Sequence, residues 1–340
     1  MKKSIKKQLR HTAICAGILT TVLASGQAVA ADAWKPTKNV ELVVAAGAGG
    51  GTDQLARLIQ SIISRHHLLD VSTVVQNKGG GNGAEGFLDI KLAKGDPYKL
   101  IVGTNNAYLL PLVAKLGYQW TELTPVATVA QDDFILWGSA SSPFKTAKEY
   151  LAAVKADPSK YPMGGSQSKD VDQTLTMLLN KEEGTKFIYI PFKSGGEAST
   201  QLAGGHIGSN TNNPAESVSQ WKAGQVKPMC VFSKERMVYT KKITADMAWS
   251  DVPTCVSQGV KIEEYRFPRT VFMPGGVTAA QRQFYVDLLK KVTETPEFKE
   301  YLERGALVPS FLTGDEFQAY IKKDADRAEA IFKEAGWLRK

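Results

Sequence analysis

Apolar positions along this chain follow two periods in turn, one typical of strands and one typical of helices. Residues 38–47 form a β-rich run, and residues 53–67 then place Leu55, Leu58, Ile59, Ile62 and Ile63 at helical spacing. The next segments predict a strand over 70–78, a helix over 84–94 and a strand over 98–106. This βαβαβ order is typical of a parallel sheet with helices on its faces.

A second series of the same kind follows the long β-like run TPVATVAQDDFILWG. The two α/β modules cover roughly residues 31–130 and 138–245, without an evident sequence repeat. The tail is mostly helical, and we interpret Arg269–Met273 as a return crossing to the first module. Two lobes joined by more than one crossing strand predict a hinged cleft. The predicted division is residues 31–137 plus 250–340 for lobe 1, and residues 138–249 for lobe 2.

The first thirty residues have the layout of a secretory signal peptide. MKKSIKKQLR carries five positive charges and no acid, and a mostly apolar run covers residues 12–24. Ala28-Val29-Ala30 is a small-x-small site for cleavage before Ala31. The alternative is a membrane anchor, but a span needs about 20 apolar residues. We therefore predict residues 1–30 to be a signal peptide and the mature protein to be periplasmic.

Removing this segment changes the charge of the chain. The 340-residue sequence has a net charge of +8, and loss of the five positive charges lowers it to +3. That value does not favour binding to nucleic acid. No later stretch approaches an apolar run of about 18 residues, so we expect a soluble mature protein. Its length favours two domains, and we expect a monomer.

Two cysteines, Cys230 and Cys255, remain after processing. In an oxidising compartment an isolated pair favours one disulfide. The alternative is two buried thiols.

The glycine-rich segment after the first strand does not match a nucleotide site. Gly47-Ala48-Gly49-Gly50-Gly51-Thr52 ends in threonine, where the dinucleotide fingerprint requires glycine. A second segment, residues 81–86, matches the fingerprint literally, but the following strand ends in Asn105 and Asn106 without the ribose-binding acid. We therefore expect no nucleotide cofactor.

Motifs for catalysis are sparse. Ser166 and Lys169 form a literal S-x-x-K, but no K-T-G or S-D-N accompanies it. An exported serine hydrolase using this pair is therefore only an alternative, and we predict no enzyme activity and no metal. Asp132 and Asp133 could resemble a carboxylate pair, but we expect them to face solvent or cap a turn.

One structural motif recurs instead: a strand, then a loop rich in Gly, Ser or Asn, and then a helix. It occurs at AGAGGGTD, NKGGGNGAE, MGGSQSKD, FKSGGEA and TNNPAE. Each such loop leaves N–H groups and the positive end of a helix dipole at the carboxyl edge of a sheet. Helix starts of this kind suit carboxylates and phosphates, and sheet edges of this kind hold ligands.

The chain resembles the periplasmic receptors of tripartite tricarboxylate transporters, the Bug-type solute-binding proteins. The matching segments occur in the family's order and at its spacing: GAGGGTDQLARL, VVQNKGGGNGAEG, LIVGTNN, ELTPVATVAQD, IPFKSGGEASTQLAGGHI, NNPAESVSQWKAG and VFMPGGVT. The resemblance implies an α/β fold with two lobes in a Venus-flytrap arrangement, each a mostly parallel sheet flanked by helices. It also implies capture of a carboxylic acid and its delivery to membrane permease subunits.

Carried over by position, the resemblance implies a set of ligand-binding residues. They are Gly50, Gly51, Thr52, Asn105 and Asn106 from lobe 1, and Ser166, Gln167, Ser168, Lys193, Asn212 and Asn213 from lobe 2. Lys78 and Arg269 are possible partners for a second carboxylate, although Arg269 is equally well interpreted as structural.

The sequence departs from the family pattern at two places. Ala46-Gly47-Ala48 lacks the usual proline before the glycines, and Gly208-Ser209 stands where an acid often precedes the last polar loop. Because the missing acid would pair with a ligand amine, we predict a di- or tricarboxylate, possibly aromatic, and not an amino acid. Presentation of the ligand to a sensor kinase, instead of a transporter, remains an alternative.

Overall fold

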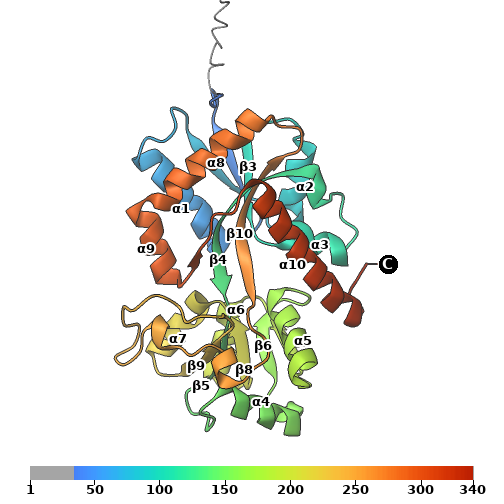
Figure 1. The fold of residues 1–340 in the computed structure, drawn as a ribbon, viewed down its shortest axis with the longest axis vertical. Coiled ribbons are helices and arrows are strands. Elements are labelled where there is room, and N and C mark those ends of the chain that lie inside the picture. The colour runs from blue at the N-terminus through green and yellow to red at the C-terminus, as the bar shows by residue number, and fades with distance from the viewer. Residues whose placement is uncertain (1–33, 340) are drawn as a thin grey trace, which may run out of the picture. The chain divides into compact units, whose positions relative to one another are not determined.

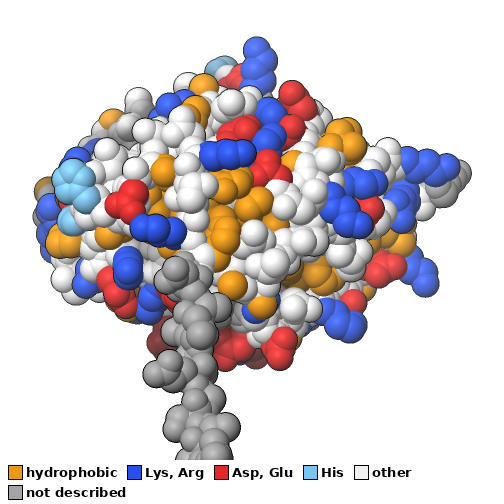
Figure 2. Space-filling view, turned by 90° about the horizontal axis from the view of Figure 1, so that it is seen from above, with side chains coloured by type: hydrophobic (Ala, Val, Ile, Leu, Met, Phe, Trp, Pro, Cys, Tyr) orange, Lys and Arg blue, Asp and Glu red, His pale blue; other side chains and the backbone are white. Residues whose placement is uncertain are grey.

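The computed structural model describes residues 34–339. The predicted signal peptide and its cleavage site lie outside these residues. Within residues 34–339, no helix is both long enough and apolar enough to cross a membrane. Seen from the end of the molecule that carries α8, positive and negative side chains are interspersed around an apolar area (Figure 2).

The first of two sheets has six strands in the order β11-β4-β10-β3-β1-β2 (Figure 1). The strands are β1 Val40–Val44, β2 Thr73–Asn77, β3 Lys99–Gly103, β4 Leu123–Asp133, β10 Arg266–Pro274 and β11 Val308–Pro309. The helices of this lobe are α1 Gly51–Arg65, α2 Ala84–Leu92, α3 Asn106–Val113, α8 Ala279–Glu294, α9 Pro296–Gly305 and α10 Gly314–Glu334. The helical spacing predicted for residues 53–67 is confirmed, because Leu55, Ile59 and Ile62 of α1 are buried.

The second sheet has five strands in the order β7-β6-β8-β5-β9. The strands are β5 Ile135–Ser139, β6 Met163–Ser166, β7 Tyr189–Phe192, β8 Ser209–Asn212 and β9 Val226–Val231. The helices are α4 Ala147–Ala156, α5 Val171–Glu183, α6 Gly195–Ala203 and α7 Val218–Lys222, and a short 3-10 helix, Pro214–Ser217, precedes α7. Both sheets are mixed: the βαβ units pair in parallel, whereas β5 and β10 pair antiparallel with their neighbours.

Two neighbouring stretches of chain connect the sheets. The long β-like run divides at Phe134, because β4 belongs to the first sheet and β5 to the second. The strand β10 pairs antiparallel with β4 and brings the chain back (Figure 1). Phe267 of β10 packs in the core of the second lobe, and Val271 packs in the core of the first. The chain therefore passes from one core to the other between Phe267 and Val271, and Val271 and Met273 of the predicted return crossing already pack in the first core.

Cys230 and Cys255 form a disulfide in the second lobe, which confirms the bond that the sequence favours. Both residues are buried within that lobe's core. The bond closes a loop with a sequence separation of 25 residues.

Replacing both cysteines by serine is expected to lower the free energy of unfolding by about 3 kcal/mol, because the unfolded chain regains the freedom that the loop removes. Urea denaturation of the oxidised protein and the double variant measures the difference. Reduction of the wild type provides the matched control, since it removes the bond without changing the sequence. Equal midpoints for all three samples would contradict the expectation.

Candidate functional site: a polar cavity between the two sheets

A cavity of about 620 Å³ lies where the carboxyl ends of strands from both sheets meet. From the first sheet, its lining includes the loop after β1 and the segment after β3. From the second sheet, it includes the end of β6 and the loops after β7 and β8. The crossing strand β10 and the end of α9 complete the wall. The cavity thus occupies the edge at which open α/β sheets hold ligands.

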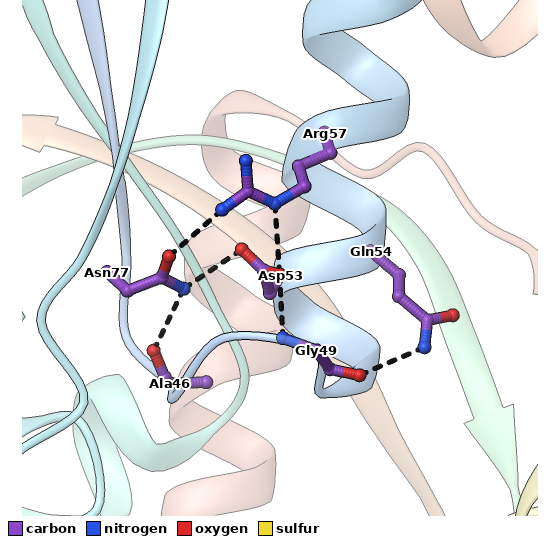
Figure 3. Close-up of polar contacts among 6 residues, drawn as sticks. All are labelled: Ala46, Gly49, Asp53, Gln54, Arg57 and Asn77. Carbon is purple, nitrogen blue, oxygen red and sulfur yellow. Dashed lines mark hydrogen bonds and ion pairs between the residues drawn. The ribbon is translucent and has the colours of Figure 1, made fainter.

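The loop that leads into α1 is held in place by Asp53 (Figure 3). Its carboxylate accepts hydrogen bonds from Gly49 N–H at 2.8 Å, Arg57 Nε at 3.0 Å and Asn77 Nδ2 at 2.9 Å. Burial acts to raise the pKa of Asp53, but these hydrogen bonds outweigh it and lower the pKa. Asn77 also donates to the carbonyl of Ala46 at 3.2 Å. The loop is therefore fixed from the side away from the cavity.

The first N–H groups of α1 donate no hydrogen bond within residues 34–339. Gly50 is the N-cap residue and provides no side-chain cap. Within residues 34–339, the N–H groups of Gly50, Gly51 and Thr52 make no hydrogen bond, and all three residues line the cavity. Such groups, together with the helix dipole, favour an anion.

Arg269 reaches this helix start from β10. Its Nε donates to Asp132 Oδ2 at 2.7 Å and its Nη2 donates to Asp132 Oδ1 at 3.0 Å, while its Nη1 donates to Thr52 Oγ1 at 3.1 Å. The guanidinium also stacks over the ring of Phe267, at 4.9 Å from its centroid. Burial opposes the charge, but the carboxylate of Asp132 outweighs it and raises the pKa of Arg269. A permanent cation thus lies beside the free N–H groups.

The prediction that Asp132 and Asp133 face solvent or cap a turn is wrong. Asp132 is 2% exposed and Asp133 is 1% exposed. Asp132 pairs with Arg269, and Asp133 pairs with Arg266. Both acids lie where β4 and β10 pair between the two lobes, so each is covered by protein and is compensated by an arginine of the neighbouring strand. Burial raises the pKa of Asp133 to about 6, despite the opposing effect of Arg266.

On the wall from the second sheet, several N–H groups at the start of α5 are already bonded to side chains of the same segment. Ser166 donates through its Oγ to Asp172 Oδ2 at 2.7 Å, and its N–H donates to the same oxygen. The N–H of Lys169 donates to Gln173 Oε1, and that of Val171 donates to Asp170 Oδ1. Burial raises the pKa of Asp172 well above its usual range and raises that of Asp170.

Ser166 is not arranged as a nucleophile activated by Lys169. Its hydroxyl donates to the buried carboxyl of Asp172. Lys169 is exposed and is not among the residues that line the cavity.

Glu216, in the 3-10 helix after β8, brings a carboxyl into the cavity wall. Withdrawal from bulk water raises its pKa to about 7; Asp132 and Asp170 add to the rise, and Arg269 opposes it. The adjacent Asn213 donates through Nδ2 to Asp132 Oδ1 at 2.8 Å. Glu216 thus adds to the wall an acid whose pKa lies above the usual range of a glutamate.

The residues predicted from the sequence divide into two groups. Those that line the cavity are Gly50, Gly51, Thr52, Asn106, Ser166, Gln167, Asn213 and Arg269. Those that are not among the lining residues are Lys78, Asn105, Ser168, Lys193 and Asn212.

Three of this second group have clear partners elsewhere. Asn105 is buried and donates to Asp324 at 3.4 Å, and Asn212 donates to the carbonyl of Gly195 at 2.8 Å. Lys78 pairs with Asp89 at 2.9 Å.

Sequence reasoning missed several charged residues of the wall, namely Asp132, Asp170, Glu216 and Arg304. Asp170 and Glu216 belong to the segments MGGSQSKD and TNNPAE, which the sequence marks as strand-loop-helix junctions. The signal was therefore present, but the acids at these junctions were not distinguished from ordinary capping residues. Within residues 34–339, no group of three or more His, Cys, Asp or Glu side chains is arranged to hold a metal ion.

Comparison with known proteins agrees with this geometry. A family model described as "Tripartite tricarboxylate transporter family receptor" matches residues 55–337. The chain belongs to this receptor family. A Cupriavidus necator relative, "UPF0065 protein in gbd 5'region", is 27% identical over 334 residues, covering 97% of this chain and 98% of the relative.

Two solved structures share the fold of this receptor. "Structure of a periplasmic transporter" has a TM-score of 0.76 and 26% identity, covering 90% of this chain and 99% of the other. An R. palustris protein solved with adipate has a TM-score of 0.76 and 24% identity, covering 88% of this chain and 98% of the other. The predicted family and the two-lobed α/β fold are confirmed.

Proposed function

We propose that this receptor works in the periplasm, where it captures an organic acid in the cavity and delivers it to permease subunits of a tripartite transporter. The observation that carries the proposal is the row of free N–H groups at Gly50, Gly51 and Thr52, beside the guanidinium of Arg269. A carboxylate bound there would accept hydrogen bonds that the protein itself leaves unmade.

Family membership supports the same class of ligand, since a fold neighbour was solved with adipate. On the first wall we assign one carboxylate of the ligand to Gly50, Gly51 and Thr52, with Asn106 at its side. On the second wall, Ser166, Gln167 and Asn213 would contact the rest of the molecule. The di- or tricarboxylate that the sequence predicts has a carboxylate that would bind at Gly50, Gly51 and Thr52 on the first wall.

Delivery requires the ligand to be enclosed and then released. Because β4 and β10 join the lobes side by side, a bend at these strands would bring the two walls together. The closed form would then present to the permease a surface that differs from the surface of the open form. Uptake of the bound acid by cells that lack this receptor tests the delivery step. Unchanged uptake with a changed transcriptional response would favour the sensor-kinase alternative.

A thermal-shift screen of mono-, di- and tricarboxylates is expected to find at least one ligand that stabilises the receptor. At a free concentration of about 100 times the dissociation constant, the gain is about 2.7 kcal/mol. The matched controls are the neutral amides of the same acids, which lack the anion that the helix start favours. A screen in which no carboxylate responds, or in which the amides respond equally, would contradict the proposed function.

A further inference from the structure

The charged side chains of the cavity wall include one arginine without an acidic partner. Among the lining residues of the described chain, the charged ones are Asp132, Asp170, Glu216, Arg269 and Arg304. Arg269 and Asp132 compensate each other, because they form an ion pair at 2.7 Å. Arg304 makes no ion pair and no side-chain hydrogen bond within residues 34–339. It is therefore the cation of the wall that remains for an anionic group of a ligand.

Tyr301 lies three residues before Arg304 on α9 and brings an unpaired hydroxyl to the same cavity. The residue is only 8% exposed, it lines the cavity, and its hydroxyl makes no hydrogen bond within residues 34–339. Burial raises the pKa of this phenol, although the charges of Arg269 and Arg304 oppose the rise, so the hydroxyl keeps its proton and serves as a donor. Because a buried polar group without a partner is costly, a ligand oxygen placed here would be stabilised.

The end of α9 and the start of α1 open on the same cavity. The two helices run in opposite directions along one groove, and at its far end Arg65 of α1 pairs with Glu297 of α9 at 3.0 Å. At the near end, Thr52 of α1 and Arg304 of α9 both line the cavity. A ligand that bridges these two helix ends would meet N–H donors at one end, and a guanidinium and a hydroxyl at the other.

We propose that Tyr301 and Arg304 hold the second carboxylate of a dicarboxylic ligand, while the start of α1 holds the first. The inference rests on the proposed function, because it assigns the other end of the same ligand. It replaces the partners that the sequence predicts for this carboxylate, since Lys78 is not among the lining residues and Arg269 is already paired. The guanidinium supplies charge and the phenol a directed hydrogen bond, so the receptor prefers a diacid to a monoacid of the same length.

The second lobe offers a competing place for that carboxylate at the start of α6. Gly196 lines the cavity there, and the N–H groups of Gly195 and Gly196 donate no hydrogen bond within residues 34–339. That wall has no lysine or arginine among its lining residues, however, and it carries Asp170 and Glu216. A doubly negative ligand would bring its second charge to two acids at this wall, whereas Arg304 supplies a positive charge.

The test compares each straight-chain diacid from malonate to suberate with its half-amide of the same length, by titration calorimetry. The half-amide keeps one carboxylate for the start of α1 and replaces the other by a neutral group of similar size. We expect at least one diacid to bind about tenfold more tightly than its half-amide. Arg304→Gln should abolish this preference and leave the affinity for the half-amide within about twofold of the wild type. Lys299→Gln removes an exposed positive charge from the same helix outside the cavity, and should keep the preference.

Tyr301→Phe separates binding from stability. Because the hydroxyl has no partner within the described chain, its removal should leave the urea midpoint unchanged while the affinity for the preferred diacid falls about tenfold. The matched control is Tyr285→Phe, since the Tyr285 hydroxyl donates to the carbonyl of Pro97 at 2.8 Å and lies outside the cavity lining. That variant should lower the midpoint and leave the affinity unchanged. An unchanged affinity in Tyr301→Phe would overturn the role of its hydroxyl.

The remaining outcomes separate the inference from the proposed function. If no diacid binds more tightly than its half-amide, or if Arg304→Gln keeps the preference, the assignment is overturned, and the organic-acid receptor stands as long as a carboxylate shifts the melting temperature. If Gly196→Val then removes the preference that Arg304→Gln keeps, the second carboxylate binds at the start of α6. A Cβ at Gly196 would meet no atom closer than 3.9 Å, so this variant should fold. If no carboxylate shifts the melting temperature, the proposed function and the inference both fail.

Discussion

Valine at position 51 is expected to weaken carboxylate binding about 100-fold or more, while the protein keeps its fold. The N–H groups of Gly50, Gly51 and Thr52 are the free donors of the first wall, and a hydrogen bond to a charged group contributes roughly 1.5–3 kcal/mol. A Cβ on Gly51 would lie 3.1 Å from Nη2 of Arg269, and the two methyl groups of valine would extend into the space above the helix start. Titration with the best carboxylate of the screen measures the loss.

The control for this substitution is Ser64→Val, in the same helix. Ser64 is exposed and is not among the residues that line the cavity, so the variant adds the same β-branched side chain to α1 without affecting the proposed site. Both variants should unfold close to the wild type in urea, because a β-branched residue in a helix costs only a few tenths of a kcal/mol. An unchanged affinity in Gly51→Val would show that the carboxylate binds elsewhere.

The local pattern of apolar residues predicted much of the fold, because the spacing of these residues differs between strands and helices. The βαβαβ order of the first module, the strand of residues 266–274 and the helical tail all follow from runs of about twenty residues or fewer. The loop before α1 was also predictable, since four glycines between a strand and a helix leave N–H groups without a cap. Gly50, Gly51 and Thr52 accordingly lie in the cavity wall.

Pairing across the chain was not predictable from such runs. Asp132 and Arg269 are separated by 137 residues, and no local pattern shows that these two side chains pair with each other. The division of one β-like run at Phe134 has the same origin, because both halves have strand composition and only their partners differ.

The direction in which a side chain points within a loop was also not predictable from the sequence. Asn105 and Asn106 are adjacent in the sequence, but only Asn106 lines the cavity. Asn105 is buried against Asp324 of α10, a helix more than two hundred residues away in the sequence. The start of α3 determines which of the two points to which side, and the tertiary position of α10 provides the partner. Neither fact is contained in the segment LIVGTNN.

Asparagine at position 132 is expected to destabilise the ligand-free receptor by about 3–5 kcal/mol. The substitution keeps the size of the side chain but removes the charge that compensates Arg269, whose side chain is 10% exposed. Two of the three hydrogen bonds from the guanidinium end on this carboxylate, and Asn213 donates to it as well. Burial of an uncompensated guanidinium is costly, because the neutral amide of asparagine no longer balances its charge. Urea denaturation without ligand measures the change.

The matched control is Asp70→Asn, which breaks the ion pair with Lys35. Asp70 is 83% exposed and Lys35 is 68% exposed at the side chain, so solvent screens the pair and the expected change is below about 1 kcal/mol. The double substitution Asp132→Leu with Arg269→Met should recover part of the stability lost in Asp132→Asn, because it removes both buried charges at once. If Asp132→Asn unfolds at the same urea concentration as Asp70→Asn, Arg269 is solvated in the free receptor. The guanidinium would then be available to the ligand as a direct ion-pair partner, instead of being held by Asp132 beside the helix start.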